Sequence, residues 1–160
     1  MEVILICLVI AAALFAAAFI AKRRFGLLGL ALAAGSILSG IWEYDAGLVA
    51  SLFGIPNSPL AATAVLALIV LLPAGVLLFH GDSYKSLVGR IIGASLFTLL
   101  AIAFLIEPLA YVLMPQGFGA DVFRWLINNK NLIIGVGLIV AVIDLFLTKP
   151  AHLAIRHRKH

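Results

Sequence analysis

The sequence predicts an all-α integral membrane protein, a bundle of five transmembrane helices with two short interfacial helices. Of its 160 residues, 64% are hydrophobic and 11% are charged, and the mean hydropathy is +1.22. Such a composition leaves too little polar surface to cover a soluble domain. Apolar runs of helix length follow one another, so we expect one transmembrane domain over residues 1–150 and a basic cytoplasmic tail over 151–160.

The first two predicted spans, 3–21 and 25–42, are separated by Lys22, Arg23 and Arg24. Each cation costs about 2.5–3.5 kcal/mol at the centre of a membrane helix, so three in a row indicate a turn at the membrane surface. A cleavable signal peptide is the alternative interpretation of the first span. Signal peptides carry their basic residues before the apolar run, whereas here the basic residues follow it.

Small residues at a spacing of four characterise the second span. Gly35 and Ser39 form one pair, and Ser36 and Gly40 form another. Each pair lies on one side of a helix and lets a neighbouring membrane helix approach closely. We expect these residues to pack within the chain, and homodimerisation is the alternative.

The third and fourth predicted spans are 60–79 and 87–106. Pro73 lies inside the third span and predicts a kink, because proline removes a backbone donor. Gly89 and Gly93 form a Gly-x-x-x-Gly helix-packing motif at the start of the fourth span. Arg90 lies within that motif, which places it at the edge of the membrane.

Two shorter segments, 46–55 and 121–129, have apolar residues along one helix face and predict helices that lie on the membrane surface. The fifth predicted span is 132–148. If each span crosses once, nine of the 11 Lys and Arg residues lie on one side, and only Arg124 and Lys130 lie on the other. Because cytoplasmic loops carry the excess of cations, the N-terminus is expected outside and the C-terminus in the cytoplasm. The aromatic residues expected at the outer surface are Trp42, Trp125, Tyr44 and Tyr111.

Two acidic residues are candidates for a functional or inter-helix polar role. Asp144 lies inside the fifth span, where a charge is costly unless it is paired or hydrated. Our hypothesis is an ion pair with Arg90 that joins the fourth and fifth spans, with Lys149 or the headgroup region as alternatives. Glu107 adjoins Pro108 at the outer end of its span, an arrangement also found at ion and proton sites of transporters.

No arrangement of residues in the sequence predicts catalysis or a cofactor. Paired cysteines, a phosphate-binding glycine loop and a Ser-His-Asp order are missing. The four histidines do not predict a metal site, and the cations occur in short clusters that do not indicate nucleic-acid binding. The basic tail is instead a candidate for contact with anionic lipid, with roughly 1 kcal/mol per juxtamembrane cation.

The chain resembles the colicin V production family of small bacterial inner-membrane proteins over about half its length. The similar features are the uncharged first span, the basic turn Lys22–Leu27 that opens the second span, and Gly89–Ala94 at the start of a later one. The turn lacks the second glycine and the second basic residue of that family, and the fifth span with its basic tail is additional. The resemblance implies a role in envelope homeostasis or export, and it assigns no functional residue.

These observations favour a non-catalytic structural or accessory subunit of the inner membrane that acts through protein or lipid partners or as a homo-oligomer. The alternative is a transporter or channel component with Glu107 and Asp144 on an ion or proton path. A continuous polar cavity between the two carboxylates would favour transport. A closely packed interior would favour the accessory subunit.

Overall fold

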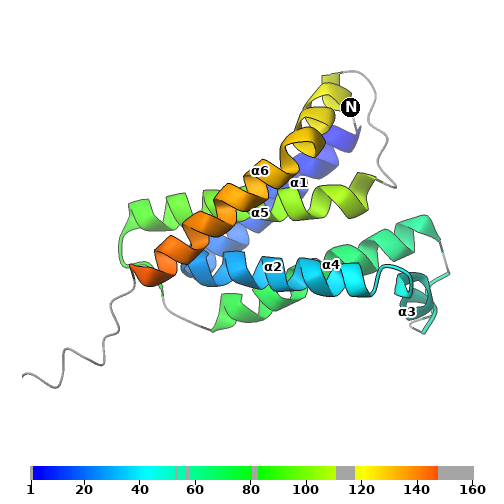
Figure 1. Cartoon of the computed structure of the whole chain (residues 1–160), viewed down its shortest axis with the longest axis horizontal. Helices are drawn as coiled ribbons and strands as arrows, with labels where there is room; N and C mark the ends of the chain where they lie inside the picture. Colours follow the sequence, from blue (N-terminus) through cyan, green and yellow to red (C-terminus); the bar gives the residue numbers. More distant parts are fainter. Residues whose placement is uncertain (1, 53, 57, 81–82, 111–117, 148–160) are drawn as a thin grey trace, which may run out of the picture.

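The computed structural model describes residues 2–52, 54–56, 58–80, 83–110 and 118–147, with the backbone alone for residues 2–4, 118 and 119. Within these ranges the chain forms six α-helices and no β-strand, which confirms the all-α class. The helices are α1 (Glu2–Ala21), α2 (Phe25–Ile41), α3 (Ala46–Leu52), α4 (Pro59–Phe79), α5 (Leu87–Ala110) and α6 (Phe118–Phe146) (Figure 1).

Five long helices form the bundle and reverse direction from one to the next, so that α1 begins at one end and α6 finishes at the other (Figure 1). All five contribute to one buried core. Its most buried members include Ala18 of α1, Phe25, Leu28 and Leu32 of α2, Val70 of α4, Phe97 and Leu100 of α5, and Ala141 of α6. We call the end that contains the α1–α2 and α4–α5 connections the basic end, because Lys22, Arg23, Arg24, Lys85 and Arg90 all lie there.

Three helices are long and apolar enough to cross a membrane: α4, α5 and the Ala120–Phe146 part of α6. A fourth is counted if α2 and α3 form one broken span, although the two meet at an angle of 92°. The apolar stretch Leu5–Ala21 of α1 is shorter, and α2 has 17 residues against the roughly 20 of a full crossing. By length and composition, the described chain therefore provides three or four such helices instead of the five predicted.

The predicted surface helix 121–129 is not a separate element, because α6 continues without a break from Phe118 to Phe146. The prediction placed a boundary at the polar residues that follow Ile127. Those residues remain helical: the Asn129 amide donates a hydrogen bond to the Trp125 carbonyl at 2.8 Å, and no proline interrupts the segment. Polarity here marks where the apolar part of a long helix begins, and it does not mark a turn.

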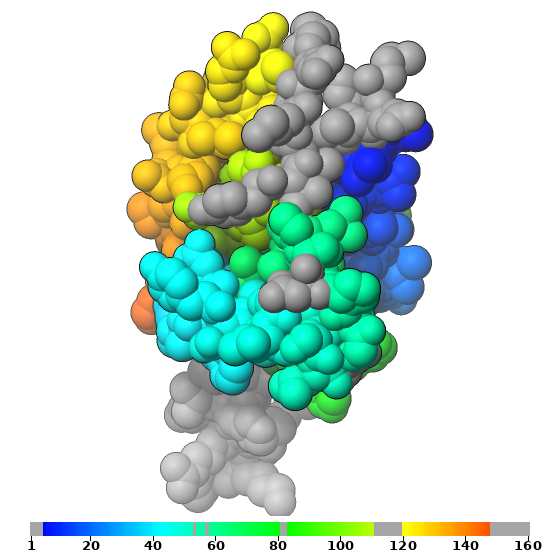
Figure 2. Space-filling view, turned by 90° about the vertical axis from the view of Figure 1, so that its right-hand side faces the viewer, coloured from blue at the N-terminus to red at the C-terminus, as the bar shows by residue number. Residues whose placement is uncertain are grey.

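The other predicted interfacial segment does form a helix, α3, which is shorter than expected. Gly54 has φ +72°, a left-handed conformation that closes helices, and the Ile55 N–H bonds the Ala50 carbonyl at 3.1 Å. Ala46 and Ala50 are buried, whereas Leu48 and Leu52 are exposed. Figure 2 shows this end of the molecule, with α3 and the start of α4 in cyan and teal.

Both helices with an internal proline continue through it, so α5 does not end near residue 106 and is helical as far as Ala110, the last residue described before the gap at 111–117. The Thr63 hydroxyl of α4 donates a hydrogen bond to the Pro108 carbonyl of α5 at 3.2 Å, which joins the two helices near the second proline. The kink at Pro73 stays a prediction.

Candidate functional site

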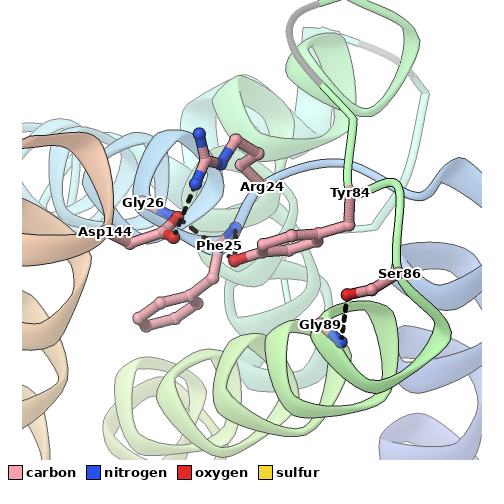
Figure 3. Close-up of polar contacts among 7 residues, drawn as sticks. All are labelled: Arg24, Phe25, Gly26, Tyr84, Ser86, Gly89 and Asp144. Atoms are coloured by element: carbon pink, nitrogen blue, oxygen red, sulfur yellow. Dashed lines mark hydrogen bonds and ion pairs between the residues drawn. The ribbon is translucent and has the colours of Figure 1, made fainter. Parts of the chain in front are cut away.

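Asp144 of α6 lies against the N-terminus of α2 at the basic end (Figure 3). Its Oδ2 accepts a hydrogen bond from the Gly26 N–H at 2.9 Å and one from the Tyr84 hydroxyl at 3.2 Å. Its Oδ1 lies 3.4 Å from Nη2 of Arg24, and the two side chains are only 16% and 20% exposed. We call Arg24, Phe25, Gly26, Tyr84 and Asp144 the Asp144 cluster.

The Asp144 cluster supplies hydrogen-bond acceptors for the first N–H groups of α2. The first N–H groups of a helix have no partner inside it, and its N-terminus carries partial positive charge. Arg24 occupies the cap position, and its side chain accepts no capping hydrogen bond. The Asp144 carboxylate caps Gly26 from another helix, and the Tyr84 hydroxyl accepts the Phe25 N–H at 3.2 Å. The cluster therefore fixes α6 and the α4–α5 connection to the beginning of α2.

Tyr84 is the centre of this connection, although it precedes α5 by three residues. Its N–H bonds the Lys22 carbonyl at 2.8 Å, and Arg24 lies over its ring at 5.5 Å from the ring centroid. Lys22 has φ 58°, so the backbone of the turn between α1 and α2 is left-handed at this residue, whose carbonyl accepts the hydrogen bond from Tyr84. Because a cation over an aromatic face is attracted to it, Tyr84 holds the basic turn by both backbone and ring.

The predicted ion pair between Asp144 and Arg90 is wrong, because Asp144 pairs with Arg24. Arg90 instead lies over the ring of Phe19 at 4.4 Å and donates from Nη2 to the Phe19 carbonyl at 2.9 Å, which joins α5 to the end of α1. The alternative partner Lys149 lies outside the described residues, as does the predicted basic tail. Arg90 retains a structural role, but on a different pair of helices.

Arg23 stabilises the C-terminus of α4. Its Nε donates to the Leu78 carbonyl at 3.0 Å and its Nη2 to the Phe79 carbonyl at 2.8 Å. The last carbonyls of a helix lack internal donors and carry partial negative charge, so an arginine is well matched to them. The side chains of Arg23 and Arg24 therefore serve distinct contacts, and Lys22 contributes its backbone carbonyl.

The small residues predicted for helix packing differ in what lies against them. A Cβ atom at Gly35 would collide with the Val70 carbonyl of α4, whereas one at Gly40 would have open space. Ser36 and Ser39 lie beside a cavity between α2, α4 and α5. The Gly89 and Gly93 motif does not receive a helix: a Cβ at Gly93 would lie 2.6 Å from the Tyr84 ring, so this motif accommodates the aromatic side chain.

Glu107 lies at the opposite end of the bundle from Asp144. Its Oε1 accepts from Lys130 Nζ at 2.9 Å, and its side chain is 67% exposed. The space between the two carboxylates is filled by large buried side chains. They are Phe25, Leu28, Leu32, Phe97, Leu100 and Leu105, each at most 3% exposed.

Sequence reasoning found Asp144 and missed Arg24, Gly26 and Tyr84. A usable signal was present, because a helix that starts at Phe25 after an arginine has no Ser, Thr, Asp or Asn at its cap. Its first N–H groups therefore need an acceptor from elsewhere. Asp144 was the one acid within an apolar run on the same predicted side.

We expect Tyr84 to ionise above the ordinary tyrosine pKa of about 10. Burial raises the pKa of Tyr84, the Phe25 N–H bond lowers it, and the nearby Asp144 charge raises it again, with an upward net shift. Above about pH 10 the unfolded chain loses this proton while the folded chain keeps it, so folding stability falls as pH rises toward the folded pKa. Below that range the contribution is constant.

An ultraviolet absorbance titration in detergent tests this expectation. The ionisation step that disappears in Tyr84→Phe should lie above about pH 10 in the folded protein. Tyr44→Phe is the control, because that ring is 94% exposed. A Tyr84 step at or below the ordinary value would contradict the contacts described above.

Together, fold and site define a small all-α protein with helices suited to a membrane and a structural ion cluster at one end. The described residues contain no group of three or more His, Cys, Asp or Glu side chains that could hold a metal ion. No protein-family model, curated protein or solved structure matches this chain.

Proposed function

We propose that the chain is a multi-pass inner-membrane protein that crosses the bilayer five times, with the N-terminus outside and the basic end in the cytoplasm. All five long helices contribute to one core, which supports a shared bundle for the two shorter helices α1 and α2. A helix a few residues short of the hydrocarbon thickness is accommodated by local thinning of the bilayer at a modest cost. The five cations of the basic end support its cytoplasmic placement.

Cysteine accessibility tests this topology. Cys7 is the only cysteine, so Cys7→Ser gives a cysteine-free background. In whole cells a membrane-impermeant thiol reagent should label Ser51→Cys of α3 and leave Ser86→Cys at the basic end unlabelled until the cells are opened. Labelling of both positions from outside, or of Ser86→Cys alone, would contradict the proposed arrangement.

We propose further that the protein acts as a non-catalytic structural or accessory subunit through protein or lipid partners. The observation that carries this proposal is the filled interior between Asp144 and Glu107. Each of the six side chains between them is at most 3% exposed, and the Asp144 carboxylate is engaged by Gly26, Tyr84 and Arg24. An acid that caps a neighbouring helix is poorly placed to exchange protons or ions along a path.

Reconstitution separates this role from transport. The purified full chain in vesicles should give no proton or sodium flux above that of empty vesicles, and the protein isolated from membranes in mild detergent should bring a partner in fixed ratio. Flux that is lost in Glu107→Gln would overturn the accessory role and favour the transporter. Arg124→Gln is the surface control, because the sequence places Arg124 on the same side of the membrane as Glu107. The role in envelope homeostasis or export stays a prediction from the resemblance.

A further inference from the structure

An open groove of about 870 Å³ runs along one face of α4, from Ala64 to His80 at the basic end. We call it the α4 groove. Every lining side chain except His80 is apolar, and within the described ranges no other helix contributes to the lining. The large side chains along it form one stripe at a spacing of three or four residues, each between 54% and 78% exposed: Leu68, Leu72, Val76 and Phe79.

The hollow of the α4 groove lies at Gly75. This residue is about one helical turn from both Leu72 and Phe79, so it lies between them on the helix surface. A Cβ atom added at Gly75 would have no other atom within 4 Å. Glycine is unfavourable inside a helix, and here no neighbouring helix requires its small size. The space therefore has room for a flexible apolar chain between the two larger side chains.

The position of this hollow suits the leaflet at the basic end. The hydrocarbon core of a bilayer is about 30 Å thick, so one leaflet covers about ten residues of a helix that rises 1.5 Å per residue. Counted back from His80, this length reaches about Leu71, and it includes Gly75. An acyl chain whose headgroup lies at the basic end would therefore pass through the hollow.

The turn between α1 and α2 brings cations to the end of the α4 groove. Arg23 donates to the Leu78 and Phe79 carbonyls at 3.0 and 2.8 Å, and its backbone forms an antiparallel bridge with Ser83. These bonds cover the last carbonyls of α4, whose partial negative charge would otherwise repel an anion. Lys22, the preceding residue, is exposed and has no ion pair within the part of the chain that the structure describes.

The charge of the basic end favours an anionic occupant of the α4 groove. Its five Lys and Arg residues outnumber the acids: Asp144 is paired with Arg24, and Asp82 of the α4–α5 connection lies outside the described residues. A second copy in the same membrane orientation would bring two basic ends together at this groove, and like charges across an interface are unfavourable. An anionic lipid headgroup would instead be attracted.

We propose that the α4 groove binds one anionic phospholipid, with an acyl chain along Gly75 and the headgroup phosphate beside the turn that contains Lys22 and Arg23. The inference rests on the proposed accessory role through lipid partners, and it names the class of lipid. Each cation at the membrane surface strengthens the binding of anionic lipid about fivefold. With two cations beside the headgroup, an anionic lipid should bind about 25-fold more tightly than a zwitterionic lipid with the same chains.

Native mass spectrometry of the purified full chain in neutral detergent tests the headgroup site. The probes are phosphatidylglycerol and phosphatidylcholine with identical acyl chains. The natural chain should retain one phosphatidylglycerol, and Lys22→Gln should reduce its preference over phosphatidylcholine about fivefold. Arg124→Gln removes the same charge at the other end of the bundle and should leave the preference unchanged. Equal preferences in the two variants, or no preference in the natural chain, would overturn the proposal.

Gly75→Leu tests the groove itself. The new side chain enters open space, so the fold should persist, while the retention of both lipids should fall by about tenfold because the apolar contact of the acyl chain is lost. Gly40→Leu is the matched control, since it makes the same change in open space on α2, outside the groove. Equal losses in the two variants would contradict the proposal. A dimer that Gly75→Leu dissociates would also overturn it, by assigning the groove to a second copy.

The lipid experiment and the flux experiment fail independently. A natural chain without lipid preference would refute this inference and leave the accessory role through protein partners. Proton or sodium flux would overturn the accessory role and leave the measured lipid preference as it is.

Discussion

Asp144→Ala is expected to lower the free energy of unfolding by about 3 kcal/mol, because it removes a charged acceptor from a partly buried site. The Gly26 N–H and the Tyr84 hydroxyl both lose their acceptor, and Arg24 loses its ion-pair partner. Asp144→Asn keeps one oxygen and should cost about half as much. Unfolding by sodium dodecyl sulfate in mixed micelles, followed by circular dichroism, measures both values.

Glu107→Gln is the control for removing an acid from a salt bridge. Its carboxylate is 67% exposed, and exposed pairs contribute about 0–1 kcal/mol. A loss in Glu107→Gln as large as that in Asp144→Ala would show that the Asp144 cluster has no special role in stability.

A double-mutant cycle then distinguishes the two candidate partners of Asp144. Combining Asp144→Asn with Arg24→Gln should give a coupling energy of about 1 kcal/mol, because the two side chains interact directly. Combining it with Arg90→Gln should give none, since Arg90 bonds the Phe19 carbonyl. Coupling to Arg90 alone would restore the interpretation made from the sequence.

The importance of Asp144 could be predicted from the sequence, whereas its partner could not. Hydropathy places residues along the membrane normal, and it put Arg24, Arg90 and Asp144 at the same level. Which cation faces the carboxylate depends on how the helices are rotated about their axes, and a uniformly apolar helix gives little information about rotation. The missing cap of α2 was the one local signal for the correct partner.

The boundary predicted before residue 132 failed for a related reason, whereas the predicted spans 3–21, 25–42 and 60–79 match α1, α2 and α4 within one residue. The break before residue 132 was inferred from polar residues, yet Asn and Lys side chains are tolerated in a helix where it leaves the apolar layer, as α6 shows. The prediction of α3 succeeded because a glycine and two prolines bound that segment in the sequence. Neither signal was reliable alone, because α5 continues through Pro108 whereas the cations Lys22–Arg24 correctly marked the turn between α1 and α2.

Small residues in this bundle make room for different neighbours, which spacing alone does not reveal. Gly89 and Gly93 have the familiar spacing and accommodate the Tyr84 ring. Gly26 and Gly29, which the prediction omitted, face α6, where an added Cβ would lie 2.6 Å from the Ala141 carbonyl and 2.9 Å from the Ala141 Cβ. Gly35 faces the backbone of α4, so it should be the least tolerant position of the second span.

Gly35→Ala is accordingly expected to destabilise the protein by about 2 kcal/mol, through overpacking between α2 and α4. The added methyl group would collide with the Val70 carbonyl and lie 3.0 Å from the Ile69 carbonyl, and a helix backbone cannot rotate away as a side chain can. Gly40→Ala makes the same chemical change on the same helix in open space. That variant should be neutral or stabilising by up to about 1 kcal/mol, because alanine is the better helix former.

Thermal unfolding of the two variants in the same detergent gives the comparison, with circular dichroism to confirm helix content. The order of stabilities should be Gly40→Ala at or above the natural chain and Gly35→Ala well below it. Because helix propensity favours alanine at both sites, only the close approach of α4 can produce a loss at Gly35. Equal stability of the two variants would mean that α2 and α4 do not pack at this point, and the shared core of the bundle would have to be reassigned.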